Sequence, residues 1–152
     1  MTTATLGGTE AAFTAKYGQP TFSNNQIRHY QTTLDGVGVL IVVELSTDGK
    51  GSPRAYFLHI VSPDSQVTWD ANTAETIAKL FLPSDAQFTQ SLTVPGFGVE
   101  QVYTSALLAA SFPASDFTDA TTNAIVAAGT FYYACGDTNE DQGGCTLTWG
   151  DD

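Results

Sequence analysis

Two histidines are the first candidates for chemistry in this chain of 152 residues. His29 and His59 lie in separate segments, 26–32 and 55–61, whose patterns are typical of strands. A catalytic histidine needs an orienting carboxylate and a nucleophile within hydrogen-bond reach, and no G-x-S-x-G, H-E-x-x-H or Walker sequence accompanies either residue. The sequence therefore favours two histidines on a sheet surface and predicts a protein that is not an enzyme.

Oxygen-bearing side chains alternate in a loop near the end of the chain. Asp137, Asn139 and Asp141 stand at every second position, as the ligands of calcium loops do. The glycine of an EF-hand loop comes one position late, at Gly143, and Thr148 stands where a bidentate Glu is required. An EF-hand is thereby excluded. Two interpretations stay open, a weak calcium site and a solvated hairpin tip that binds no cofactor.

The two cysteines of the chain flank this loop. Cys135 follows the strand-like run 130–134, Cys145 begins the run 145–149, and the residues between them are typical of turns. Cysteines that face each other across such a hairpin lie at disulfide distance, so the sequence predicts a Cys135–Cys145 disulfide rather than two free thiols. A disulfide indicates an oxidising compartment. Since residues 1–6 carry no signal region, we expect a secreted or cell-envelope protein whose signal segment is absent from this sequence, with a cytoplasmic chain as the alternative.

Aromatic side chains are the candidates for binding. The period of two along a strand puts Tyr133 and Trp149 on the disulfide face of the terminal hairpin and Tyr132 on the opposite face. Phe97 stands between two glycines, which predicts an exposed position at the tip of a turn. Exposed aromatic residues anchor many protein interfaces, so the candidate binding residues are Phe97, Tyr132 and Trp69. The alternatives are an ordinary half-exposed sheet for Tyr132 and packing onto the sheet for Phe97.

Short helices and strands must position these groups. Helices are predicted over 9–17, 73–82 and 105–112, the first capped by Thr9 and the second by Asp70 or Asn72. The predicted strands are 26–32, 37–45, 55–61, 87–94, 99–104, part of 122–134, and 145–149. Segment 37–45 is apolar on both faces, which predicts a central strand covered on both sides, and residues 1–7 are expected to fray. The fold class is α+β, an antiparallel sheet with short helices on one face, in a single domain spanning 1–152.

The first two predicted helices begin and end alike. Their matching positions are Thr9 with Thr73, Phe13 with Ile77, Tyr17 with Phe81, and Pro20 with Pro83. This match predicts two tandem α-β-β-β pseudo-repeats, about 7–62 and 66–150. The alternative is that two short capped helices resemble each other by chance.

The opening of the first predicted helix resembles that of a known family. Residues 7–20 read GGTEAAFTAKYGQP, similar to the G-x-T-x-x-x-Φ-x-x-x-Φ-G-x-P start of SmpA/OmlA-type outer-membrane lipoproteins and of the related β-lactamase inhibitor protein fold. The chain is also similar to uncharacterised secreted bacterial lipoprotein domains. The resemblance implies a broad sheet built from two tandem copies, an extracytoplasmic location and protein partners. The second copy here lacks the counterpart of Gly18, and the inhibitory loop residues of the family cannot be placed by motif.

The net charge of the chain disfavours two classes of partner. Five Lys and Arg stand against 16 Asp and Glu, giving a net charge of −11, which disfavours binding to nucleic acid or to anionic lipid. The longest apolar run, 37–43, is too short to cross a membrane. The leading hypothesis is an extracytoplasmic, non-enzymatic module that binds an unidentified protein partner. The alternatives are a self-assembling cell-surface subunit, a β-lactamase-inhibitor-like protein, and a small enzyme that uses paired carboxylates.

Overall fold

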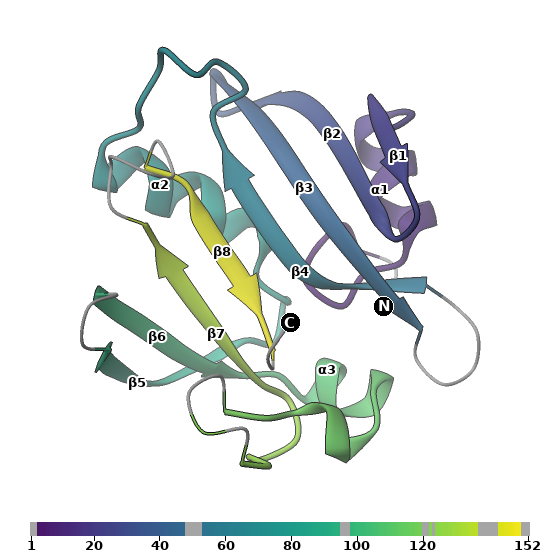
Figure 1. Ribbon diagram of the computed structural model, residues 1–152, viewed down its shortest axis with the longest axis vertical. Coiled ribbons are helices and arrows are strands. Elements are labelled where there is room, and N and C mark those ends of the chain that lie inside the picture. Colours follow the sequence, from purple (N-terminus) through teal and green to yellow (C-terminus); the bar gives the residue numbers. More distant parts are fainter. Residues whose placement is uncertain are drawn as a thin grey trace.

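One eight-stranded antiparallel sheet with short helices makes up the computed structural model (Figure 1), which describes residues 3–47, 53–94, 98–119, 122, 124–136 and 143–149. The predicted α+β class is confirmed. The helices are α1 (Glu10–Tyr17), α2 (Ala71–Ala78) and α3 (Ala106–Ser111), with 3-10 turns η1 (Lys79–Phe81) and η2 (Ala114–Asp116). The strands are β1 (Phe22–Asn24), β2 (Ile27–Leu34), β3 (Val37–Thr47), β4 (Pro53–Val61), β5 (Gln87–Val94), β6 (Gly98–Thr104), β7 (Thr130–Cys135) and β8 (Cys145–Thr148).

Two four-stranded meanders meet at the centre of the sheet. The strand order is β1-β2-β3-β4-β8-β7-β6-β5, so the last strand of each meander lies innermost. β8 pairs antiparallel with β4, which places Thr148 opposite Phe57 and Cys145 opposite Ile60. Figure 1 shows β8 in yellow between β4 and β7. The strand that joins the two meanders is therefore the last one in the sequence.

The first helix has the predicted cap, and the second begins at Ala71, two residues before the predicted start, with Asp70 as the cap rather than Asn72. The Thr9 hydroxyl accepts a hydrogen bond from the Ala12 amide at 3.2 Å, and α1 ends at Gly18, whose φ is +84°. For α2 the cap is Asp70, whose carboxylate accepts from the Thr73 amide at 2.8 Å. η1 then extends this helical segment to Phe81, close to the predicted end.

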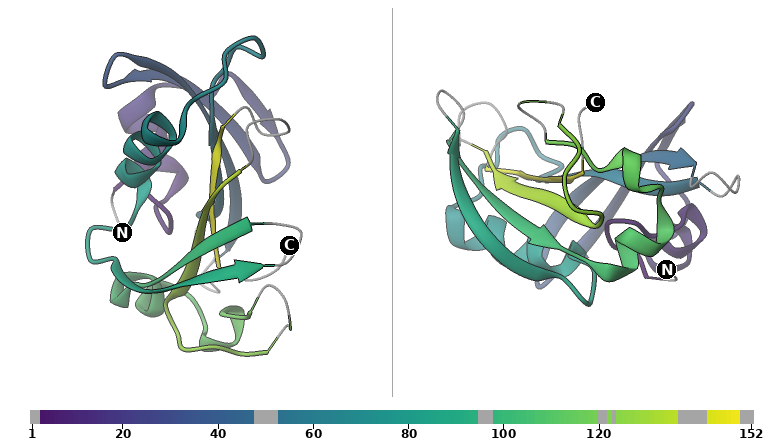
Figure 2. Two further views of the ribbon diagram at one scale, coloured as in Figure 1. Left: turned by 90° about the vertical axis from the view of Figure 1, so that its left-hand side faces the viewer. Right: turned by 90° about the horizontal axis from the view of Figure 1, so that it is seen from below.

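Both of these helices lie on the same face of the sheet, which we call the helix face (Figure 2, left). Val39, Ile41 and Val43 of β3 point into the core beneath them and are buried. The alternate residues Leu40 and Val42 point to the other face and remain half-exposed. The predicted interior position of this strand is confirmed, but cover on both sides is not observed, because among the described residues helices α1 and α2 cover one side only.

Two further segments differ from the expectation. β1 was not predicted, since its three residues are all exposed and carry no apolar alternation. Residues 1–7 were expected to fray, yet Leu6 is fully buried and its backbone amide donates to the Phe81 carbonyl at 3.0 Å. The Gly7 amide donates to the Ala55 carbonyl at 2.7 Å. One leucine among small residues shows no periodicity, so sequence patterns give no signal for this packing.

An aromatic cluster closes one end of the core near α3. The Trp149 ring lies 4.3 Å from the ring of Phe112 and 5.9 Å from that of Phe117, measured between centroids. Trp149 is buried, as predicted, on the face that carries the disulfide. Within the described part of the chain, no helix is long and apolar enough to cross a membrane.

Candidate functional site

The predicted disulfide is present and links the last two strands of the second meander, β7 and β8. Cys135 of β7 stands opposite Cys145 of β8 and is bonded to it. Cys145 is fully buried, whereas Cys135 is half-exposed. The bond thereby fixes the register of the hairpin and leaves one sulfur at the edge of a pocket.

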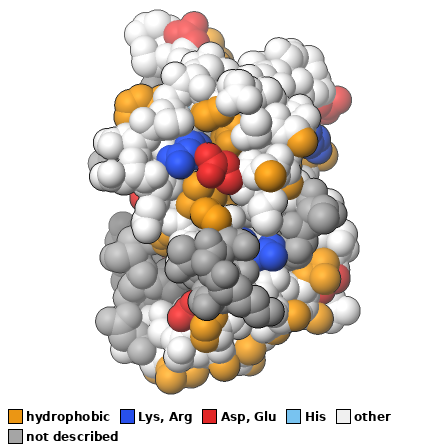
Figure 3. Space-filling model, turned by 90° about the vertical axis from the view of Figure 1, so that its right-hand side faces the viewer, with side chains coloured by type: hydrophobic (Ala, Val, Ile, Leu, Met, Phe, Trp, Pro, Cys, Tyr) orange, Lys and Arg blue, Asp and Glu red, His pale blue; other side chains and the backbone are white. Residues whose placement is uncertain are grey.

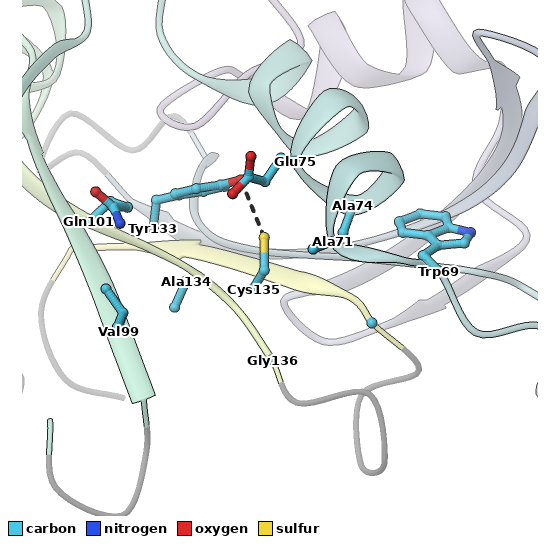
Figure 4. Close-up of a pocket in the computed structure, with 11 residues that line it drawn as sticks. Trp69, Ala71, Ala74, Glu75, Val99, Gln101, Tyr133, Ala134, Cys135 and Gly136 are labelled. Atoms are coloured by element: carbon cyan, nitrogen blue, oxygen red, sulfur yellow. Dashed lines mark hydrogen bonds between the residues drawn. The ribbon is translucent and has the colours of Figure 1, made fainter. Parts of the chain in front are cut away.

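This pocket, which we call the helix-side pocket, lies between α2 and strands β6 and β7 (Figure 4). Its volume is about 260 Å³. Figure 4 shows Glu75 projecting from α2 toward Tyr133, while Val99 and Gln101 come from β6. The Tyr133 hydroxyl lies 3.2 Å from Sγ of Cys135 and can donate to the sulfur. Burial raises the Tyr133 pKa, and the nearby Glu75 and Tyr103 raise it further, so its hydroxyl remains protonated at neutral pH. The pocket thus offers one carboxylate and one hydroxyl, with no paired nucleophile and base among the described residues.

The face of the sheet opposite α1 and α2, which we call the open face, is the larger candidate surface. Figure 1 looks onto it, with both helices behind the strands. Strand pairing aligns one row of residues across all eight strands: Asn24, Ile27, Glu44, Phe57, Thr148, Tyr132, Val102 and Gln90. A second row crosses six strands: Phe22, His29, Val42, His59, Thr146 and Ala134. Over β1 to β4 and β8 these side chains are half-exposed, and Phe22 is 46% exposed.

The two histidines lie in the second of these rows, on either side of Val42. One strand, β3, lies between the strands that carry them, which puts the two backbones roughly 10 Å apart. The Phe22 ring lies 4.8 Å from the His29 ring. The described residues contain no group of three or more His, Cys, Asp or Glu placed to hold a metal ion. The structure thus places both histidines on a sheet surface, as the sequence favours.

The open face is covered at its other end, over β5 to β7, by residues 117–119 and 124–127, which we call segment 117–127. The Val126 amide donates to the Phe117 carbonyl at 3.0 Å, and the Asp119 amide donates to the Ala124 carbonyl at 2.8 Å, so the segment folds back on itself. A pocket of about 300 Å³ lies between this segment and the sheet. Its lining includes Asp119 and Tyr132, and we call it the acid-lined pocket.

Two carboxylates and a phenol interact electrostatically at the acid-lined pocket. Burial raises the pKa of Glu100, and the charge of Asp119 raises it further. Burial also raises the pKa of Tyr132, with additional contributions from Asp119 and Glu100. Like charges and partial burial therefore both oppose ionisation of Glu100 at this pocket.

Of the predicted binding residues, Trp69 and Tyr132 are 4% and 6% exposed. Tyr132 does point away from the disulfide, opposite Thr148, but segment 117–127 covers it, so it does not lie on a solvated sheet surface as expected. Trp69 lies beneath Gly143 and lines the helix-side pocket. Such burial leaves too little accessible area for either residue to anchor a partner directly.

The remaining predicted sites belong to two loops. Phe97, Asp137, Asn139 and Asp141 lie outside the described residues. The binding role of Phe97 and the calcium site therefore stay predictions.

Sequence reasoning missed Glu75, Glu100 and Asp119. Glu100 carried one usable signal, because it alternates with Val102 on a predicted strand and shares its face. Asp119 follows an irregular segment, and no local pattern places it over a sheet. Seen from the side on which β1 lies, the described surface carries scattered apolar groups and few charges (Figure 3).

Comparison of the sequence with protein-family models and with curated proteins, and of the structure with solved structures, found no match. The fold and the geometry of the two pockets and the open face are therefore the basis for inferring function.

Proposed function

We propose that the chain is an extracytoplasmic, non-enzymatic module that binds a protein partner through the open face of its sheet. The observation that carries this proposal is the set of half-exposed apolar side chains on β1 to β4, which includes Phe22, Leu40, Val42 and Phe57. Antiparallel sheets normally present polar residues on a face that water contacts. Apolar side chains gathered on such a face, here interspersed with His29, His59 and Glu44, are a feature of interaction surfaces.

The location outside the cytoplasm rests on the disulfide. Cys135 and Cys145 are the only cysteines of the chain, and they are bonded to each other. Disulfides persist mainly in oxidising compartments, which supports export. The two tandem pseudo-repeats are likewise a proposal, supported by the strand order, since duplication of a unit of one helix and a four-stranded meander would generate two halves joined at their last strands.

A direct test adds one charge to the open face and one to a control position. Val42→Lys places a charge at the centre of the patch, and Leu80→Lys places the same charge on a residue that is 49% exposed outside that face. Immobilised wild type and Leu80→Lys are expected to retain the same partner from cell-envelope extract, and Val42→Lys is expected to lose it. Equal retention by both variants, with unchanged unfolding midpoints, would show that the open face is not the binding surface.

A second candidate, a self-assembling surface subunit, is favoured by the outer strand β5. This eight-residue edge strand carries no charged side chain, and its Phe88 is 55% exposed. Uncharged edge strands are templates for pairing with another chain. Light scattering over a wide concentration range decides the matter, because a mass that stays near 16.1 kDa excludes assembly.

The third candidate, a β-lactamase-inhibitor-like protein, rests on the resemblance of residues 7–20. Its test is the hydrolysis rate of a β-lactamase with and without the oxidised protein. An unchanged rate at a large excess of protein counts against it.

A further inference from the structure

We propose that the acid-lined pocket binds the side chain of a lysine or arginine carried by the protein partner. This inference rests on the proposed function, since the pocket lies on the same side of the sheet as the open face and continues its first row of residues. It adds a chemical class of partner residue, a long alkyl chain that ends in a cation.

The first support is a pair of polar groups without partners. Among the described residues, no cation or hydrogen-bond donor contacts the half-buried carboxylate of Glu100. Tyr132 lines the pocket, and its hydroxyl likewise has no hydrogen-bond partner in the described part of the chain. Two neighbouring oxygen acceptors that no protein donor satisfies can each accept a hydrogen bond, so this arrangement favours a ligand that supplies N–H donors.

The second support is the shape of the pocket. Leu92, Val102 and Val126 provide apolar walls, and Asp119 lines the same cavity. Glu100 stands opposite Leu92 and two residues before Val102 on the same face of β6, which places its carboxylate beside these walls. A pocket with apolar walls and acidic groups beside them matches a Lys or Arg side chain, whose alkyl stem packs while its head remains charged.

The third support is the distribution of charge along the chain. Lys79 is the last Lys or Arg in the sequence, and nine of the 16 Asp and Glu residues follow it. All four strands of the second meander therefore come from a segment with no cationic side chain. A basic partner surface is attracted to such a region over a distance of about one Debye length, roughly 10 Å at moderate salt.

A metal ion is the competing ligand for the same acids. Calcium takes six to eight oxygen ligands, and the described residues hold no cluster of three or more acidic, His or Cys groups suited to a metal. The apolar walls also contribute nothing to a metal ion, whereas they fit an alkyl stem.

The experiment titrates ¹⁵N-labelled oxidised protein at low salt with three amino-acid analogues. N-acetyl-lysine N-methylamide and N-acetyl-arginine N-methylamide are the probes, and the uncharged N-acetyl-norleucine N-methylamide is the control for the alkyl stem. Saturable shifts are expected at the amides of Val102, Asp119 and Ala127 with both cationic probes and not with norleucine. Equal shifts with norleucine, or calcium displacing both probes stoichiometrically, would overturn the proposal.

Two matched variants separate a specific site from overall negative charge. Glu100→Gln removes the unpartnered carboxylate and is expected to weaken binding of the cationic probes about five-fold, as for a partly screened ion pair. Glu75→Gln removes the same charge at the helix-side pocket and is expected to leave their binding unchanged. A loss of equal size in the two variants, or no loss in Glu100→Gln with its fold intact, would refute the inference.

The outcomes also distinguish this inference from the proposed function. A partner that is lost by Val42→Lys but retained with full affinity by Glu100→Gln overturns the pocket assignment and leaves the open face as the binding surface. A partner retained by Val42→Lys overturns the proposed function, while saturable binding of the cationic probes, weakened by Glu100→Gln, still supports the pocket as a cation site.

Discussion

Replacement of Gly143 by alanine tests how closely the disulfide hairpin approaches the loop before α2. Gly143 has a φ of +76°, and a Cβ atom built there lies 2.2 Å from the Trp69 carbonyl oxygen. Gly36 has nearly the same φ, +77°, but no atom lies within 4 Å of its Cβ position. The two glycines therefore share a backbone conformation and differ in the space around it.

The backbone conformation and the space around each glycine set how much stability its replacement by alanine should cost. A left-handed φ costs alanine about 1–2 kcal/mol, of which about 0.4–1 kcal/mol is offset because alanine restricts the unfolded chain. Gly36→Ala should therefore lower the free energy of unfolding by about 1 kcal/mol. Gly143→Ala carries the same term and must also move backbone away from Trp69, and overpacking of this kind adds about 1–3 kcal/mol.

Urea unfolding followed by tryptophan fluorescence measures both values, because Trp69 and Trp149 are buried in the folded state. Gly143→Ala should be less stable than Gly36→Ala by about 2 kcal/mol. Gly129, with a φ of +87° and the Ser105 carbonyl oxygen 2.2 Å from its Cβ position, should behave like Gly143. Equal costs at Gly143 and Gly36 would refute the close approach and with it the described wall of the helix-side pocket.

Three further predictions concern the disulfide and two carboxylates. Cys135→Ala with Cys145→Ala opens a loop of sequence separation 10 and should lower the free energy of unfolding by about 3 kcal/mol on the chain-entropy model, measured against oxidised wild type in urea. Burial opposes ionisation of Asp85, but the hydrogen bonds that its carboxylate accepts outweigh burial and hold its pKa below the usual range. The ionised carboxylate therefore stabilises the fold above the pKa of the unfolded state, and this stabilisation is lost as the pH falls. Asp85→Asn should be less stable than wild type at pH 7 and equally stable in acid, measured by urea unfolding at both pH values. The pKa of Glu100 is shifted the other way, so its contribution to the free energy of unfolding is favourable in acid and lost as the pH rises through the raised pKa. Glu100→Gln should therefore be more stable than wild type at pH 7 by a fraction of a kcal/mol, with no gain near pH 3.

The local sequence predicts most of the elements, because their signals lie within a few residues. The caps at Thr9 and Asp70 fix where two helices begin, and Gly18 fixes where one of them ends. The facing positions of Cys135 and Cys145 give the register of the last hairpin. Each of these features depends on hydrogen bonds or spacings of at most ten residues.

The candidate sites depend on contacts between distant segments, and local patterns do not report those. Tyr132 has the alternation of a surface residue, yet it is buried because segment 117–127 returns over the sheet. Asp119 approaches Glu100 through the same return. Leu40 and Val42 show the opposite case, since their apolar character predicts burial but both helices pack on the other side. Which face of the sheet a helix covers depends on how the whole sheet is assembled, and no short stretch of the sequence indicates it.

The central place of β8 has a consequence for how the molecule is made. During synthesis the ribosome releases β4 long before β8, and Ile60 finds its partner only when Cys145 is available. Until then the inner edge of each half carries unpaired backbone amides and carbonyls beside apolar side chains, the condition that exposes nascent chains to wrong pairing. Closing so long a stretch of chain is entropically costly and slow. The two halves can thus acquire local order early, while the continuous sheet, and any surface that spans it, comes into existence only at the final step of folding.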